Sequence, residues 1–252
     1  MRRALSFGLA TVAVGATSFL TVRLLPSSPV SKPAFTAILQ ESTEEYVAGA
    51  VRQREAKLFY AARADGSTVD GLITPYPEGR EYTVRSVTLV PERKYVVVIE
   101  AIESVSTTPL STKELVTLTA PPGPNCVTKG TTVLGYEKLM GHDVVKLQRK
   151  GKFYNIETWQ APALHCFALK SVKEVRNTDG SLNTRTIRTA VSLALGDPAA
   201  ELFMIPTGYV ERPPSQMNIE EGRRLLGYVP QCLIDAAPKL DRNYYRSRSA
   251  PH

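Results

Sequence analysis

Cysteine and histidine are the residue types in this sequence that could carry nucleophilic or metal chemistry. Cys166 with His142 as its base would make a thiol nucleophile. His142, His165 and Cys126 offer three metal ligands, but their spacing matches no standard zinc site. A sulfur held in a disulfide cannot act as a thiolate. The chemistry open to this chain therefore depends first on how its cysteines pair.

Catalytic and cofactor motifs do not accompany these residues. The sequence contains no Gly-x-x-x-x-Gly-Lys-Ser/Thr, Gly-x-Gly-x-x-Gly, Gly-x-Ser-x-Gly or His-Glu-x-x-His motif. Glu44–Glu45 and Glu220–Glu221 are neighbours in sequence, whereas acid/base catalysis needs carboxylates that converge on one substrate. We expect no metal, no cofactor and no catalytic residue, which leaves an exported hydrolase or thiol enzyme as the least favoured hypothesis.

The N-terminal segment has the features of an export signal or a membrane anchor. Arg2 and Arg3 precede an uncharged, largely apolar run over residues 4–22, and a Pro/Ser-rich stretch follows. Residues 16–18 give only a weak cleavage site, and the run nearly reaches the ~20 residues that span a bilayer. Residues 1–33 are therefore expected to be a cleaved signal peptide or a retained inner-membrane anchor with a linker. In both cases the rest of the chain is exported to the periplasm or cell envelope.

Export affects the cysteines, because disulfides persist in oxidising compartments. Three thiols cannot all pair within one chain. Cys126 and Cys166 lie in one stretch rich in strand signals, whereas Cys232 lies beyond it, near the C-terminus. We expect a Cys126–Cys166 disulfide in preference to a bridge that includes Cys232.

Tight-turn signals separate alternating stretches through the middle of the chain. Asp65-Gly66, Gly151 and Gly180 each lie in a short polar loop between two such stretches, which predicts three β-hairpins. Over residues 185–195 one parity is mostly apolar, which predicts a half-buried strand. The side chains expected on its packed face are Ile187, Val191, Leu193 and Leu195.

The predicted fold is mainly β: a curved antiparallel sheet or half-barrel over residues 34–216, with one or two short helices. Residues 114–119 and 202–205 are expected to be short strands, and one helical turn is expected after Asp197-Pro198. A division into two β domains near residues 120–130 stays open. Residues 217–238 are predicted to hold a short C-terminal helix, over 219–226, and residues 239–252 a disordered basic tail. A curled sheet has a concave groove in which a ligand can bind.

Three stretches carry a resemblance to a known superfamily. They read Gly135-Tyr136-Glu137, Trp159-Gln160-Ala161-Pro162 and Leu202-Phe203-Met204-Ile205-Pro206-Thr207-Gly208-Tyr209. Across about a third of the chain, they resemble uncharacterised exported bacterial proteins similar to the lipoprotein-localisation (Lol carrier-like) half-barrel superfamily. The resemblance implies an open antiparallel half-barrel with an apolar concave face under helices, in proteins that carry lipidated proteins or sense envelope state. The Cys126/Cys166 pair is not a general feature of those carriers.

A lipid-binding groove would use large apolar side chains, and three are candidates to line it. Trp159 is the only tryptophan, and a role as a core anchor is favoured over ligand contact. Leu202 and Met204 belong to the apolar stretch 202–205, where core packing is again favoured. Trp159, Leu202 and Met204 are therefore the candidate ligand-lining residues.

The formal net charge of +7 comes from the two ends of the chain. The N-terminal 33 residues hold four basic residues and no acidic one, and the last 14 hold four basic residues against Asp241. The remaining body is formally neutral, so we expect no nucleic-acid partner, which would need a basic face. Arg242, Arg246 and Arg248 are expected to contact an anionic membrane surface instead.

The favoured function is that of a non-enzymatic cell-envelope protein that binds a hydrophobic ligand, a lipid or an acylated protein. The alternative is a membrane-anchored structural or protein-interaction module.

Overall fold

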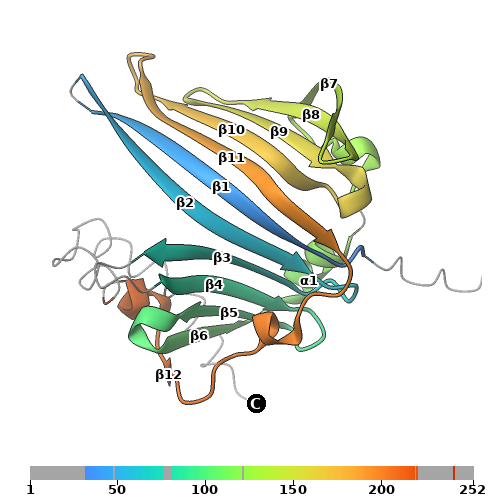
Figure 1. The fold of residues 1–252 in the computed structure, drawn as a ribbon, viewed down its shortest axis with the longest axis vertical. Coiled ribbons are helices and arrows are strands. Elements are labelled where there is room, and N and C mark those ends of the chain that lie inside the picture. The colour runs from blue at the N-terminus through green and yellow to red at the C-terminus, as the bar shows by residue number, and fades with distance from the viewer. Residues whose placement is uncertain are drawn as a thin grey trace, which may run out of the picture. The chain divides into compact units, whose positions relative to one another are not determined.

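The computed structural model describes residues 32–47, 49–75, 81–120, 122–218, 220 and 241. They form one twelve-stranded sheet that is curved and open, with short helices beside it (Figure 1). The prediction of a mainly β protein with a curved antiparallel sheet is confirmed. Several predicted segments lie outside the described residues: the N-terminal segment apart from Lys32 and Pro33, the C-terminal helix apart from residues 217, 218 and 220, and the basic tail apart from Asp241. Cys232 also lies outside them.

The strands are β1 (Phe35–Val47), β2 (Ala50–Ala62), β3 (Thr68–Pro75), β4 (Glu81–Leu89), β5 (Lys94–Ile99), β6 (Ser104–Pro109), β7 (Thr132–Leu139), β8 (His142–Lys150), β9 (Tyr154–Ala161), β10 (Phe167–Arg176), β11 (Leu182–Leu195) and β12 (Val210–Glu211). The helices are α1 (Thr112–Thr119) and the 3₁₀ turns η1 (Glu100–Ile102), η2 (Pro124–Cys126), η3 (Pro162–Leu164) and η4 (Ala200–Phe203).

The sheet is built from two meanders that share one connecting strand. Its order is β12-β6-β5-β4-β3-β2-β1-β11-β10-β9-β8-β7. Strands β2–β6 and β7–β11 each follow in chain order, and β1 pairs with both β2 and β11. Every pairing is antiparallel except that of β12 with β6. The segment near residues 120–130 thus links two halves of one continuous sheet.

All three predicted hairpins are present. The turn between β2 and β3 is closed by a hydrogen bond from the Ser67 backbone N–H to the Asp65 carboxylate at 2.7 Å, and Gly66 has a positive φ of 88°. Gly180, with a φ of 87°, turns the chain between β10 and β11. Both glycines adopt a left-handed conformation that other residues reach only with strain.

The predicted packed face of β11 is wrong at Val191, because the strand contains a bulge there. Ile38 pairs with Ser192 but Leu39 pairs with Ala190, so Val191 has no partner on β1. The extra residue exchanges the two faces of the strand. Val191 is therefore 55% exposed, whereas Ala190 is buried opposite Leu39. Leu195 lies opposite Phe35, on the predicted face, but at the end of the strand it is 66% exposed.

The strand predicted over residues 114–119 is also wrong, since this segment is helix α1. Ser111 caps the helix: its hydroxyl accepts from the Glu114 backbone N–H, and the Glu114 carboxylate accepts from the Ser111 backbone N–H. This capping box satisfies two N–H groups that otherwise lack partners. Local capping therefore prevails over the strand preference of the β-branched residues Val116, Thr117 and Thr119.

Residues 202–205 do not form the predicted strand. Leu202 and Phe203 end η4, which begins two residues later than the turn expected from Asp197-Pro198. Arg85 of β4 holds this segment, because its two terminal nitrogens donate to the Leu202 and Met204 carbonyls at 3.3 and 3.0 Å. Residues 214–218 are helical, so helix begins before the predicted range.

The two faces of the sheet pack differently. On one face, Phe203 covers a buried cluster from β2–β6: Ala61, Val69, Val87, Leu89, Val96, Val98 and Val105. The opposite face is the concave one: Tyr60 of β2 and Phe167 of β10 stack with ring centroids 4.6 Å apart, although β1 and β11 lie between their strands. Neighbouring strands are about 4.8 Å apart, so the sheet must curl toward this face for the rings to meet.

Candidate functional site

Two cavities lie on the concave face. The aromatic cavity, of about 410 Å³, is lined by residues of β1–β3, β10 and β11, by η3 and the turn after it, and by Lys32 and Pro33. The α1 cavity, of about 930 Å³, lies between α1, the strands β4–β6 and residues 214–218. Thr68 of the aromatic cavity and Thr88 of the α1 cavity are directly opposite each other on β3 and β4. Because cross-strand partners point to the same face, the two cavities adjoin at this pair.

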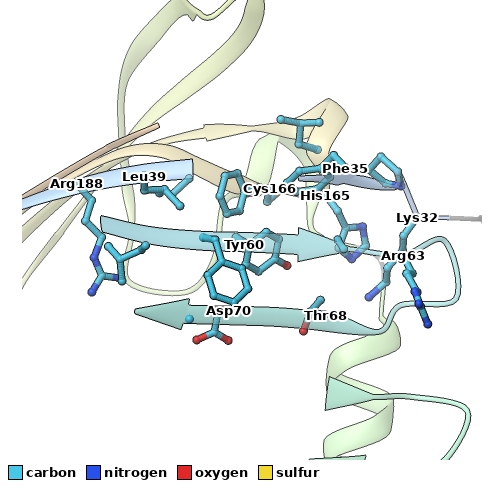
Figure 2. A pocket seen from close by; sticks show the side chains of 18 of the residues that line it. Lys32, Phe35, Leu39, Tyr60, Arg63, Thr68, Asp70, His165, Cys166 and Arg188 are labelled. Carbon is cyan, nitrogen blue, oxygen red and sulfur yellow. The ribbon is translucent and has the colours of Figure 1, made fainter. Parts of the chain in front are cut away.

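Three rings form the wall of the aromatic cavity. Phe35 contacts Tyr60 and Phe167 with centroid distances of 5.6 and 5.2 Å, and Figure 2 shows Phe35 and Tyr60 in the cavity. Tyr60 is largely buried, and this burial, with a smaller effect from the charge of Asp70, raises the pKa of its hydroxyl to about 12. The phenol therefore stays protonated at physiological pH.

Charged side chains occupy the two ends of this cavity (Figure 2). Asp70 and Arg188 lie at one end, where Arg188 also pairs with Glu41. Although water reaches part of Asp70, the surrounding walls raise the pKa of its carboxyl, and the nearby charge of Arg188 opposes this shift. Lys32 lies at the other end, so one end holds a carboxylate near a guanidinium and the other holds an ammonium.

We expect Asp70→Asn to stabilise the protein at neutral pH. The folded pKa of Asp70 lies above the ordinary value of 3.8, so the folded state binds the proton more tightly than the unfolded state does. Stability is then lost as pH rises through the interval between these two values, and asparagine has no such loss. In urea unfolding, the variant should have a higher midpoint than wild type at about pH 7. Below about pH 3 the two midpoints should be equal. An equal midpoint at both pH values would contradict this expectation.

The C-terminal end of α1 is held at the edge of the aromatic cavity. The Lys32 ammonium donates to the Leu118 carbonyl, and burial lowers the pKa of Lys32. A cation at a helix C-terminus complements the helix dipole. Burial, followed by the charge of Lys32, lowers the pKa of His165, which a hydrogen bond with the Ala120 backbone opposes. Two basic side chains therefore meet the last turn of the helix.

A disulfide between Cys126 and Cys166 braces the same region, and it is the pair that the sequence favoured. Their Cα atoms are 5.4 Å apart, and the bond closes a loop with a sequence separation of 40. Cys126 is buried against Val145 and Leu147 of β8. With its sulfur bonded, Cys166 offers no thiolate to His142.

The α1 cavity has an apolar floor and an open roof. Val97 and Tyr95 of β5 and Ser106 of β6 form the floor, and Met217 forms one wall. Helix α1 is the roof, yet none of its side chains is buried, and Val116 is 62% exposed. A helix of eight residues with no buried side chain is only weakly held in place by packing.

The sequence contained a signal for the floor of this cavity. The continuous apolar run Tyr95–Ile99 is typical of a strand covered on both faces, and Val96 and Val98 are fully buried on the face away from α1. Tyr95 and Val97 alternate with them and reach the α1 cavity. No sequence motif identifies Ser106 as a cavity residue, because a single serine within a strand does not form a recognisable pattern.

The three candidate ligand-lining residues are not brought together. Trp159 is buried in the core, with Lys146 and Lys170 over its ring at 4.6 and 4.8 Å. Leu202 packs against the cluster on the opposite face of the sheet. Met204 is 61% exposed. None of the three lines the aromatic cavity or the α1 cavity.

Two features are absent from the part of the chain that the structure describes. No group of three or more His, Cys, Asp or Glu side chains there is arranged to hold a metal ion. Within the same residues, no helix combines the length and apolar character needed to cross a membrane.

No protein-family model matches the sequence, and no curated protein matches it at a significant level. Among solved structures, PNGF-II is 12% identical with a TM-score of 0.39, and the match covers 70% of this chain but only 31% of PNGF-II. A LolA superfamily protein from Nitrosomonas europaea is 12% identical with a TM-score of 0.31, over 69% of this chain and 91% of that one.

LprF from Mycobacterium bovis is 11% identical with a TM-score of 0.31, over 70% of this chain and 90% of LprF. LolA superfamily proteins, which the sequence motifs resemble, are thus among the solved structures that this chain matches. At these identities and TM-scores, none of the likenesses assigns an activity, a ligand or a partner to this chain.

Proposed function

We propose that this chain is an exported, non-enzymatic cell-envelope protein that holds the acyl chain of a lipid or an acylated protein in the α1 cavity. The observation that carries the proposal is the cavity itself. Its volume of about 930 Å³ is near the upper end of the range of about 300–1,000 Å³ for small-molecule sites. Its floor and wall are largely apolar, as an acyl chain requires.

The weak packing of α1 supports the same proposal. Helix α1 can adjust to a bound ligand, because a helix without a buried side chain is the part of the enclosure that moves at the lowest cost in buried apolar area. The hydrogen bond from Lys32 to the Leu118 carbonyl keeps one end of α1 attached. The helix can therefore swing while remaining part of the fold.

Filling the cavity should abolish binding. Val97→Trp adds a large side chain to the floor of the α1 cavity, and we expect it to weaken the binding of a fluorescent fatty-acyl probe at least tenfold. Val191→Trp is the matched control, because Val191 is 55% exposed on β11 and lies outside the cavity. Fluorescence titration measures both, and unfolding curves check that the variants are folded. Equal affinities for the two variants would refute acyl binding at this site.

The remaining organisation follows from export. We propose that residues 1–33 direct the chain to the periplasm or cell envelope, as a signal peptide or an inner-membrane anchor. Residues 34–216 form the β domain and 217–238 a C-terminal helical segment. Residues 239–252 form a basic tail whose Arg242, Arg246 and Arg248 contact anionic lipid.

A further inference from the structure

Ser106 has a side-chain hydroxyl that the protein leaves unused. It lies on β6, opposite Val97 of β5, and lines the α1 cavity. The residue is 2% exposed. Among the described residues its Oγ has no hydrogen-bond partner. Buried hydroxyls without a partner are uncommon because losing water without replacement destabilises the fold.

Three hydroxyls near Ser106 are engaged within the protein, whereas that of Ser106 is buried without a partner among the described residues. The Tyr95 hydroxyl donates to the Ser86 Oγ at 3.1 Å. On the same strand as Ser106, the Ser104 hydroxyl donates to the Ile102 carbonyl at 2.9 Å. On α1, the Thr117 hydroxyl donates to the Lys113 carbonyl at 2.9 Å. The free donor therefore lies on the floor of the cavity, where a bound molecule can accept from it.

The charges around the cavity indicate which acceptor fits. The charged residues that line it are Lys113 and Glu114 on α1. Both are exposed, and the Glu114 carboxylate is already bound by Ser111. A free fatty-acid carboxylate at the depth of Ser106 would be a buried anion, whereas the lining cation, Lys113, is exposed on α1, so this arrangement is unfavourable. A neutral carbonyl oxygen matches a neutral buried hydroxyl.

We propose that Ser106 donates its hydroxyl hydrogen to the carbonyl oxygen of a fatty-acyl ester, so that the α1 cavity selects ester-linked glycerolipids over molecules that have the same chains but no carbonyl. This inference rests on the proposed function. It adds the chemical class of the ligand and names the residue that recognises it.

Ester and ether lipids with identical chains test the proposal. Wild type should bind a diacylglycerol lipid about three- to tenfold more tightly than its di-O-alkyl analogue, as expected for one neutral hydrogen bond. Ser106→Ala should bind both lipids alike, with an affinity for the ether lipid no lower than that of wild type. Ser104→Ala is the matched control on the same strand, and it should keep the wild-type preference.

Thermal unfolding of the ligand-free protein gives a second readout. Ser106→Ala removes an unsatisfied group and should raise the midpoint, whereas Ser104→Ala breaks a hydrogen bond and should lower it. Equal binding of ester and ether lipids by wild type overturns the role of Ser106 and leaves acyl binding standing. An equal loss of both lipids in Ser106→Ala also overturns it. If wild type binds neither lipid, both the inference and the proposed function fail.

Discussion

Replacing both bridged cysteines, as Cys126→Ser/Cys166→Ser, is expected to lower the free energy of unfolding by about 4 kcal/mol. The bond closes a loop with a sequence separation of 40, and in the chain-entropy model a loop of that length restricts the unfolded state by about this amount. The loss is large compared with the total stability of about 5–15 kcal/mol that is usual for a domain. Urea unfolding of the variant and wild type, under oxidising conditions, measures it.

The control for this experiment is Cys232→Ser, which leaves the Cys126–Cys166 bond in place. Its unfolding midpoint should stay at the wild-type value, and its midpoint in reductant should fall to that of the double variant. A double variant as stable as wild type would show that the bond does not constrain the unfolded chain. The region to monitor is the aromatic cavity, because Cys166 lies on its wall.

The second large effect is expected for Phe35→Ala, at about 3–5 kcal/mol of lost stability. Phe35 is 1% exposed and joins β1 to Tyr60 of β2 and Phe167 of β10. Truncation leaves a void where the sheet curls, and the surrounding strands cannot collapse into it without losing their pairing. Chemical unfolding, followed by tyrosine fluorescence and circular dichroism, gives the value.

Phe153→Ala provides the comparison for Phe35→Ala, because Phe153 is 37% exposed and lies in the loop before β9. The same chemical change should cost less than about 1 kcal/mol there. If the two variants lose equal stability, the aromatic cluster is not the point at which the curl of the sheet is fixed.

The strands and hairpins of this fold follow from its sequence because their signals are local. Asp65-Gly66 and Gly180 act through turn geometry that needs no distant contact. The run Tyr95–Ile99 likewise indicates a strand from local composition alone, and its Val96 and Val98 are fully buried. The pairing of β1 with β11 could not be predicted in this way, since no local pattern marks two strands so distant in sequence.

Three features were mispredicted for specific physical reasons. In α1, one hydrogen-bonded cap at Ser111 outweighs the strand preference of the residues that follow. In β11, the bulge at Val191 exchanges the faces, and a strict alternation cannot show that. Residues 202–205 have the composition of a strand, but Arg85 holds their backbone instead. The α1 cavity depends on contacts between separate elements, so its residues had no common signal.

The central position of β1 has a consequence for how the sheet assembles. Thr43 and Thr186, which face each other across β1 and β11, are 143 positions apart in the chain. At a synthesis rate of about 5–20 residues per second, the paired residues of β11 are synthesised about 7–30 s after those of β1. During that time its thirteen residues are an open strand edge, which invites pairing with the wrong chain.

The glutamates of β1 reduce this risk and then select the correct partner. Glu41 and Glu44 place negative charge on the edge of β1 before β11 pairs with it, and this charge disfavours pairing with most other strands. On β11 they meet Arg188 and Arg185, at the same spacing and in reverse order. A shift by one residue would break both matches. Glu44 thus lies opposite an arginine, and with Glu41 it favours the observed register between the two meanders.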